Sequence, residues 1–533
     1  MFGINFTNLL LGVTGLYIVL KIFLLPKKKL APLPPGPRPL PFAGNIADLP
    51  PPGAQEWQHW LKHKDLYGPI SSVTVFGQTI IILNDVHAAF ELLEKRSALH
   101  SARPSMVFAA EMVGWEHATA MLPSCDRLRT HRKNFHQLLG TKRAISSFFP
   151  LENVETRRFL LRVLEKPDDL LQHIRTHAGA IILKITYGYT IEPHKKDPLV
   201  DIAEQALEQF SVAATPGAFL VDTVPLLKYL PDWFPGTGFK RTARAWKKNL
   251  TDAVEKPYAF ARQQMREKGK GAYEESFLSK VFEEKDTLTP EEDHVAKWSA
   301  ASIYTGGADT TVSSIACFFL AMTLYPDVQR KAQEEIDRVV GTDRLPGFED
   351  REKLPYIDAI VKEILRWHPV APMGLPHVTS EEDVYEGYRI PKGALLFPNI
   401  WAFTHDPTTY HDPMTFSPER FLSTTPEPDP HILSFGFGRR ICPGRVLADS
   451  SIYLSVAQSL AVFDISEAKD INNDNKNDEN EEVHFRPGVI SHPVPFRASI
   501  KPRSAKQEAL IRAVEREHPW QESDARVLEG IVY

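Results

Sequence analysis

The segment Phe-Gly-Phe-Gly-Arg-Arg-Ile-Cys-Pro-Gly at residues 435–444 constrains the fold of this chain more than any other. It places Cys442, one of three cysteines, in a glycine-rich loop that is followed by a helix-like run at residues 446–454. Loop amides, the positive end of that helix and any bound cation would stabilise a thiolate here. Such a thiolate can be the axial ligand of a haem iron, where it donates electron density that favours O–O cleavage. The alternative is a buried structural cysteine in a turn.

The decapeptide fills every fixed position of the pattern F-x-x-G-x-R-x-C-x-G, so the chain resembles the cytochrome P450 monooxygenases. The resemblance implies a mainly α fold with a small β region (the cytochrome P450 fold), in one large catalytic domain. It also implies haem b as the cofactor and Cys442 as the axial ligand of its iron. Further haem contacts are implied for Phe435, Gly438, Arg440 and Gly444.

A second motif, Gly-Gly-Ala-Asp-Thr-Thr at residues 306–311, lies inside an apolar stretch that predicts one helix over residues 294–324. Each mid-helix glycine costs about 1 kcal/mol, a cost that close approach of a flat cofactor would justify. The motif resembles A/G-G-x-D/E-T of the same family, in which Thr310 hydrogen-bonds dioxygen and Asp309 relays protons. Heterolytic O–O cleavage needs two protons, so a hydroxyl and a carboxylate in a dry pocket suit it. A kinked helix with a solvated aspartate is the alternative.

Glu363 and Arg366 stand three residues apart on an apolar helix predicted at residues 356–367, so both charges share one face. Most such pairs are solvated and contribute little, whereas a buried pair needs further partners. The segment Phe-Ser-Pro-Glu-Arg-Phe at residues 416–421 offers Arg420, and it resembles the F-x-P-E-R-F segment of the family. The resemblance implies a structural triad of Glu363, Arg366 and Arg420 behind the haem.

The two haem propionates need cationic or donor partners, for which arginine is well suited. By motif position these are Arg440, Arg132 and His377. The chain departs from the family at Leu128, where a tryptophan is expected four residues before Arg132. One propionate hydrogen bond is therefore lost or supplied by another residue.

The segments that resemble the substrate-lining parts of the family are apolar and carry little charge. This favours a neutral, lipophilic and fairly bulky substrate, although ordinary core packing is the alternative. The predicted pocket residues are Met106, Phe108, Met112, Phe210, Ile303, Val370, Met373 and Val489.

The N-terminus carries a membrane signal. Residues 6–25 are mostly apolar and Lys27, Lys28 and Lys29 follow, which predicts a transmembrane anchor at residues 1–26 with the rest of the chain cytoplasmic. A cleaved signal peptide fits less well, because the basic cluster follows the apolar run. Residues 27–50 form a basic, proline-rich hinge. The resemblance implies a single-pass protein of the endoplasmic reticulum membrane.

The remaining pattern fits one catalytic domain at residues 51–504 and a C-terminal extension at residues 505–533. Helical spacing dominates residues 85–370, and short strands are predicted at residues 71–83 and 383–397. Residues 466–482 are polar and acidic, which predicts a surface loop. The net charge of −5 gives no support for nucleic-acid binding.

The resemblance extends over most of the chain to fungal microsomal enzymes of the O-methylsterigmatocystin oxidoreductase type. The blocks that carry it are residues 76–83, 171–175, 233–236, 366–369, 396–407 and 518–520. It implies a monooxygenase of secondary metabolism that receives electrons from NADPH through NADPH–cytochrome P450 reductase, with cytochrome b5 as a conceivable second donor. Two rivals stay open: a haem-thiolate isomerase or dehydratase that needs no reductase, and a non-catalytic haem-binding paralogue.

Overall fold

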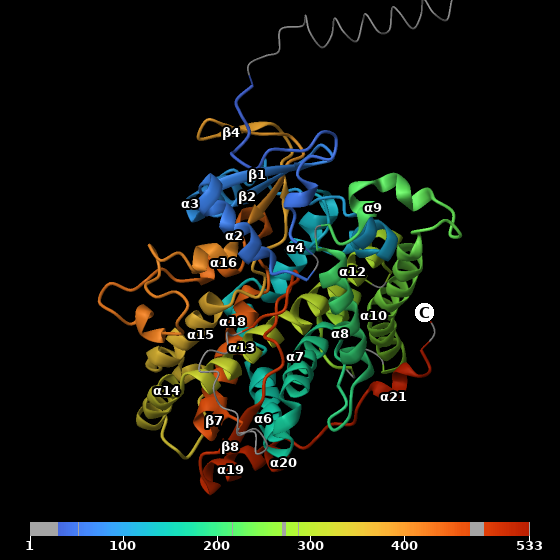
Figure 1. Cartoon of the computed structure of the whole chain (residues 1–533). Helices are drawn as coiled ribbons and strands as arrows, with labels where there is room; N and C mark the ends of the chain where they lie inside the picture. Colours follow the sequence, from blue (N-terminus) through green and yellow to red (C-terminus); the bar gives the residue numbers. More distant parts are fainter. Residues whose placement is uncertain are drawn as a thin grey trace, which may run out of the picture.

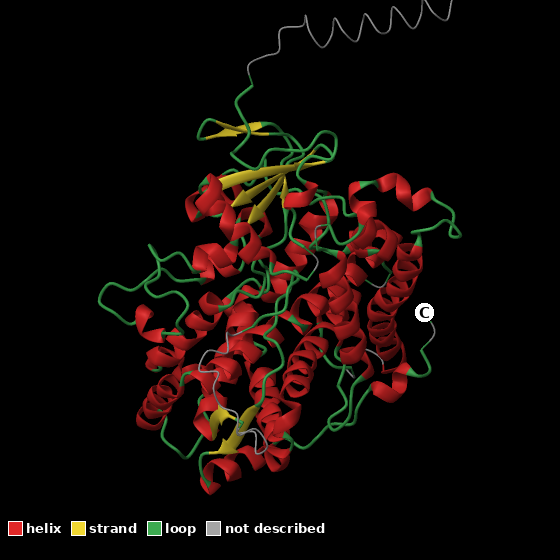
Figure 2. Cartoon of the chain, viewed as in Figure 1, coloured by secondary structure: helices red, strands yellow, loops and turns green. Residues whose placement is uncertain are grey.

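The computed structural model describes residues 30–51, 53–215, 217–268, 273–285, 287–468, 484–531 and 533. The predicted anchor at residues 1–26 lies outside the described residues, as do residues 27–29 of the hinge and residues 469–482 of the predicted polar loop. Within the described chain, helices dominate and small sheets lie toward the edges (Figure 2), which confirms the predicted mainly α fold with a small β region.

Helices predominate between residues 85 and 370, as the apolar spacing predicts, and further helices lie before and after that range. The α-helices are α2 (Glu56–Tyr67), α3 (Val86–Ala89), α4 (Asp126–Leu139), α5 (Lys142–Ser146), α6 (Phe149–Glu165), α7 (Leu170–Tyr187), α8 (Pro198–Ala213), α9 (Leu220–Thr223), α10 (Gly238–Lys268), α11 (Phe277–Glu284), α12 (Pro290–Ala308), α13 (Thr310–Leu324), α14 (Pro326–Val339), α15 (Pro355–Trp367), α16 (Ile400–Thr404), α17 (His431–Ser434), α18 (Arg445–Val462), α19 (Ala505–Arg512), α20 (Val514–Glu517) and α21 (Ala525–Leu528). The 3₁₀ and π turns are η1 (Ile46–Asp48), η2 (Phe90–Lys95), η3 (Val107–Val113), η4 (Trp115–His117), η5 (Pro167–Asp169), η6 (Pro225–Tyr229), η7 (Phe348–Lys353), η8 (Pro418–Phe421) and η9 (Gly438–Arg440).

A four-stranded sheet lies at the N-terminal side of the molecule (Figure 1), in the order β1 (Ile70–Val75), β2 (Gln78–Leu83), β6 (Leu395–Pro398) and β3 (His377–Val378). β1 and β2, which cover the strands predicted at residues 71–83, form an antiparallel hairpin, and β2 runs parallel to β6. Two smaller sheets pair β4 (Asp383–Tyr385) with β5 (Tyr388–Ile390), and β7 (Phe463–Glu467) with β8 (Ala498–Pro502).

The centre of the fold is α13, which is apolar on all sides and buried from Thr311 to Met322. A helix that is hydrophobic all round must pack on every face, and α13 contacts α7, α15 and α18. In the described chain one helical stretch, Pro290–Leu324, is long and apolar enough to cross a membrane, with a mean hydropathy of 1.3 over its best window. Because 67% of that window is buried inside the protein, its role as the core helix accounts for its composition.

The stretch predicted as one helix is two helices, α12 and α13, which meet at Asp309. Asp309 has φ −129° and ψ −32°, outside the α-helical region, so the interruption falls after the two glycines. It is local, because the Ser313 N–H still donates to the Asp309 carbonyl at 3.1 Å.

The C-terminal extension is tied to helices formed much earlier in the chain. Arg157 of α6 pairs with Glu517 at 2.7 Å, and the Trp520 ring lies under the guanidinium groups of Arg158 and Arg162, at 4.7 and 5.2 Å. Figure 1 shows the extension running along one edge of the molecule from α19 and α20 to α21.

Candidate active site

The cysteine loop is closed by its own main chain. The Cys442 N–H donates to the Phe435 carbonyl at 2.8 Å, and α18 begins three residues after the cysteine. Burial raises the pKa of the Cys442 thiol, while the Gly444 amide and the charge and amide of Arg445 oppose that rise. A cation at the sulfur would complete the stabilisation of a thiolate.

Two glycines of this loop meet different demands. Gly438 has φ +52°, and a Cβ there would lie 2.5 Å from the Leu93 carbonyl oxygen, so only glycine fits against the end of η2. Its N–H also donates to the Glu94 carboxylate. Gly444 precedes α18, and a Cβ placed there would come within 3.9 Å of the Cys442 sulfur. The loop backbone thus leaves the sulfur side uncrowded.

The Gly-Gly-Ala-Asp-Thr segment has one bare face and one packed face. A Cβ on Gly306 would meet no atom within 4 Å, whereas a Cβ on Gly307 would lie 2.9 Å from Ile182 of α7. Thr310 donates from its hydroxyl to the Gly306 carbonyl at 2.7 Å, which holds the hydroxyl along the helix. A flat group therefore has access to the helix at Gly306.

Three arginines gather beside the cysteine loop. Arg132 donates to the Ile441 carbonyl at 3.1 Å, and Arg440 donates to the carbonyls of Ser101 and Leu122 at 2.7 and 2.8 Å. Arg103, which sequence reasoning missed, donates to the carbonyls of Ala120, Leu375 and Pro376. Its only sequence signal is an arginine followed by proline, Ser-Ala-Arg-Pro at residues 101–104.

These arginines fit a dianionic ligand. Within the described residues no ion pair joins Arg103, Arg132 or Arg440 to a carboxylate, and the buried Nη1 of Arg440 has no hydrogen-bond partner. Burial and the neighbouring positive charges lower the pKa of Arg103 to about 9 and that of Arg440 to about 10, so both stay charged at neutral pH. Charge of one sign that is withdrawn even partly from water needs an opposite charge. Two carboxylates of a haem would supply it.

His377 is placed differently from this set. It lies on β3, buried, with Nδ1 2.6 Å from the His100 carbonyl, so Nδ1 donates and the neutral ring keeps Nε2 as an acceptor. Burial lowers the pKa of His377 well below its usual range, and the charge of Arg103 adds to this. Neutral His377 therefore accepts at Nε2, and donation to a propionate would require it to take a proton.

Comparisons with known proteins agree with this geometry. The family model described as cytochrome P450 matches residues 34–497.

The chain belongs to the cytochrome P450 family.

The chain is 51% identical to cytochrome P450 monooxygenase ppsD of Aspergillus oryzae, over 98% of both chains. It is 47% identical to cytochrome P450 monooxygenase claR of Ampulloclitocybe clavipes, over 98% of this chain and 96% of the relative. It is 45% identical to O-methylsterigmatocystin oxidoreductase of Aspergillus flavus, over 96% of this chain and 95% of the relative. The protein is thus a cytochrome P450 monooxygenase, and the family implies haem.

The predicted triad of this P450 is assembled in the fold. Arg366 donates twice to the Glu363 carboxylate, at 2.7 and 2.8 Å, and Arg420 lies 3.2 Å from the same carboxylate. The side chains of Glu363 and Arg366 are fully buried, and that of Arg420 is 4% exposed. Arg366 and Arg420 also donate to main-chain carbonyls of residues 404–415, so the triad fixes the segment that leads to the cysteine loop.

An ion-pair network joins the two ends of the cysteine loop. His431 of α17 lies 2.6 Å from Asp429 and 3.1 Å from Asp449 of α18. Arg351 of η7 binds the Asp449 carboxylate with two hydrogen bonds, of 2.6 and 2.9 Å, and Lys362 lies 3.8 Å from Asp429. Burial disfavours the charged imidazole, but the two carboxylates outweigh it and raise the pKa of His431 to about 9.

The His431 network predicts a loss of loop stability in alkali. Because the folded pKa lies above the ordinary value of about 6.5, the stabilisation is complete below pH 6.5 and is lost as pH rises through about 9. Its size is on the order of 2 kcal/mol after discounting for partial exposure. We expect the thiolate Soret band of the wild type to decline more between pH 7 and 9.5 than that of His431→Gln, which lacks the titrating group. Parallel declines would contradict the prediction.

Most of the predicted pocket residues meet in one apolar cluster beside α12. Met106, Phe108 and Phe210 are buried there, Met112 and Val489 pack against them, and Ala301 of α12 completes the cluster. Val370 lies beside the Val489 segment, because its carbonyl accepts from the Ser491 N–H at 2.9 Å. Phe219, which stacks on Phe108 with ring centroids 3.4 Å apart, closes the cluster from the segment before α9.

Two predicted pocket residues do not join this cluster. Ile303 packs with Ile181 and Ile182 of α7, because it stands about 200° around α12 from Ala301. Met373 packs instead beneath the four-stranded sheet, with Trp60 and Ile80. Where each of these side chains points depends on how its segment is rotated about its own axis, and resemblance to a family segment does not determine that rotation.

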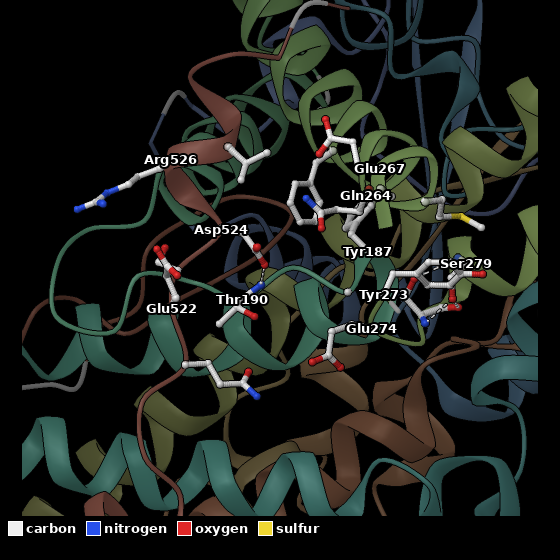
Figure 3. Close-up of a pocket in the computed structure, with 18 residues that line it drawn as sticks. Tyr187, Thr190, Gln264, Glu267, Tyr273, Glu274, Ser279, Glu522, Asp524 and Arg526 are labelled. Atoms are coloured by element: carbon white, nitrogen blue, oxygen red, sulfur yellow. Dashed lines mark hydrogen bonds between the residues drawn. The ribbon is translucent and has the colours of Figure 1, made fainter. Parts of the chain in front are cut away.

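A separate cavity of about 510 Å³ opens between the end of α7, α10 and the C-terminal extension (Figure 3). Its polar lining includes Glu267, Glu274 and Asp524, and Asp524 accepts from the Thr190 N–H at 2.8 Å. No predicted site residue lines this cavity, so it is not the site of the P450 chemistry.

The retention of haem by this P450 should depend on Arg103. We expect Arg103→Met to speed the transfer of haem to apomyoglobin about tenfold, because one charge-assisted bond to a buried carboxylate contributes about 1.5–3 kcal/mol. The exposed loop residue Arg439 is the matched control, and Arg439→Met should leave the transfer rate unchanged. Equal rates for the wild type and Arg103→Met would contradict the assignment.

Proposed function

We propose that this P450 inserts one atom of dioxygen into a lipophilic small molecule of fungal secondary metabolism, with electrons from NADPH delivered by a separate reductase. One observation carries the proposal. The Cys442 thiol lies at the start of α18 against backbone amides, beside half-buried arginines that no described carboxylate pairs with. Relatives named as monooxygenases, and one named as an oxidoreductase of O-methylsterigmatocystin, support the reaction class and the kind of substrate.

The haem would be held by this chain's own residues. Cys442 would be its axial ligand, the loop of Phe435, Gly438 and Gly444 would cover that face, and Gly306 would let the ring approach α12. Arg440, Arg132 and Arg103 would bind the propionates, and Arg103 would supply the donor that Leu128 does not. When bound, the haem supplies the iron at which dioxygen is reduced by two electrons.

Asp309 and Thr310 would deliver the protons that oxygen activation consumes. One oxygen atom enters the substrate and the other leaves as water, so each turnover consumes two protons and two electrons. The Thr310 hydroxyl donates its single proton to the Gly306 carbonyl, so it would turn from that carbonyl to donate into the pocket, and Asp309 would resupply the proton. The apolar cluster of Met106, Phe108, Phe210 and Val489 would exclude water and orient the substrate.

The reductase would approach the face that carries the cysteine loop. Arg439 and Lys133 are exposed there, whereas Arg127 and Arg129 of the basic run at residues 127–133 pair with Glu291 and Asp126. These two pairs reduce the positive surface, which would still steer an acidic partner. We extend the proposal to the domain organisation: a single-pass anchor at residues 1–26, a hinge at 27–50, a catalytic domain at 51–504 and a C-terminal extension at 505–533. The anchor would hold the protein in the endoplasmic reticulum membrane, with the catalytic domain in the cytoplasm. Cytochrome b5 is a further candidate electron donor.

The test is a difference spectrum of the dithionite-reduced membrane fraction with and without carbon monoxide. We expect the long-wavelength Soret band of thiolate-ligated ferrous haem, and oxygen uptake that requires NADPH and reductase. A folded sample without a haem band would overturn the proposal in favour of a non-catalytic paralogue. Turnover without NADPH would instead indicate an isomerase or dehydratase.

A further inference from the structure

Asp309 has a partner that the oxygen-activation motif does not contain. Its Oδ2 lies 3.0 Å from Nε2 of His492, a residue 183 positions later in the chain. The Asp309 carboxylate caps no backbone N–H of α13, so it is directed to this histidine. The side chains of Asp309 and His492 are 14% and 20% exposed, so both are partly accessible to water.

The segment that carries His492 is pinned on both sides. Ser313 of α13 donates to the Ser491 carbonyl at 2.6 Å, and the Ser491 N–H donates to the Val370 carbonyl at 2.9 Å. The Ser491 hydroxyl lies 2.8 Å from Nε2 of His368. These contacts place His492 against Asp309 as part of the packed core, beside the pocket residues Val370 and Val489.

Asp309 also lines a small cavity of about 10 Å³, which is room for about one water. Arg175 of α7 and Glu204 of α8 line it and pair at 2.8 Å. The charged and titratable groups that face the Asp309–His492 pair from neighbouring elements are therefore Arg175, Glu204 and His368. Arg175 and Glu204 already pair with each other, and burial keeps His368 neutral by lowering its pKa to about 3.

We propose that His492 is a positioning residue that supplies protons to Asp309 and thereby sets the pH dependence of oxygen activation. The inference rests on the proposed monooxygenase function. The imidazolium Nε2–H bond breaks as the proton moves to Asp309 Oδ2, which leaves a neutral imidazole that carries its remaining proton on Nδ1. The ring then turns toward solvent, Nε2 takes up a proton there, and the imidazolium returns to Asp309. Histidine is suited to this task because its charge ordinarily changes between pH 5 and 8. Asp309 would then transfer the proton toward Thr310, at the start of α13.

The coupling between the two residues can be measured without turnover. In holoprotein labelled with ¹³C-histidine, the His492 resonance is assigned by its absence in His492→Gln, and its chemical shift is compared between the wild type and Asp309→Asn at one pH. We expect Asp309→Asn to move the resonance, because the variant replaces the carboxylate that Nε2 contacts. An unchanged resonance would overturn the proposal, since the two side chains would then not interact.

The role in turnover is tested by NADPH oxidation in holoenzyme reconstituted with NADPH–cytochrome P450 reductase and oxygen, without added substrate. We expect His492→Gln to slow oxidation about tenfold, to flatten its pH profile between pH 6 and 8 and to increase the solvent deuterium isotope effect. The control is His484→Gln, an exposed histidine of the same segment, which should behave as the wild type. A normal rate and pH profile in His492→Gln would overturn the relay while the thiolate band still supports the monooxygenase. A wild type without that band would overturn both.

Discussion

Replacing Cys442 with serine should abolish the thiolate band of the carbon monoxide complex and reduce oxygenase turnover at least about a thousandfold, equal to about 4 kcal/mol of barrier. A serine hydroxyl keeps the shape of the loop, since the closing bond runs from the residue 442 N–H to the Phe435 carbonyl. It lacks the soft, electron-donating sulfur that favours O–O cleavage. The measurement is the reduced carbon monoxide difference spectrum of purified Cys442→Ser.

The other two cysteines lie outside the cysteine loop. Cys317 is fully buried in the core, where burial raises the pKa of its thiol, and Cys125 precedes α4. Cys125→Ser is therefore the matched control and should keep the thiolate band. Persistence of that band in Cys442→Ser would show that the ligand lies elsewhere.

Removing the charge of Glu363 should be the most damaging single change to the fold. In Glu363→Gln the buried Arg366 would lose the negative charge and one of its two acceptor oxygens, and it would rely on the amide oxygen and on main-chain carbonyls. An uncompensated buried charge costs about 3–5 kcal/mol, a large part of the usual stability of a domain. We expect little soluble holoprotein and a much lower thermal midpoint.

The double variant Glu363→Gln, Arg366→Met tests whether the unpaired charge is the cause. It should recover part of the lost stability, because Arg420 still pairs with Glu427 at 2.7 Å. The exposed pair of Arg344 and Glu349, 3.8 Å apart, offers the control Glu349→Gln, which should change stability by less than about 0.5 kcal/mol. A normal yield and thermal midpoint for Glu363→Gln would show that the triad is dispensable.

The sequence predicts the chemistry of this P450 better than its geometry. Motifs of contiguous residues, such as the cysteine loop and the helix of Glu363 and Arg366, could be predicted because the chemistry needs those residue types at fixed spacing. The position of the helix interruption, Asp309, could not be predicted. The two glycines before Asp309 are where the sequence favours an interruption, whereas packing against the neighbouring helices determines where it occurs.

Residues that act through tertiary contacts escaped prediction for a physical reason. Arg103 stands in an irregular segment with no periodicity, and only the fold brings it to Arg440. His492 reaches Asp309 across 183 residues. Ile303 is a different case, because its helix is predicted but the direction of its side chain, which packs against α7, is not.

The contact of Trp520 with Arg158 and Arg162 also has a consequence for synthesis on the ribosome. α6 is synthesised about 340 residues before α19. At typical rates of 5–20 residues per second, Arg158 and Arg162 therefore lack their contact with the Trp520 ring for roughly 20–70 seconds. During that interval α6 also lacks α18, its neighbour in the core. The N-terminal half is therefore expected to need chaperone protection until translation ends. A stop codon before Trp520 would permanently remove the aromatic contact of Arg158 and Arg162.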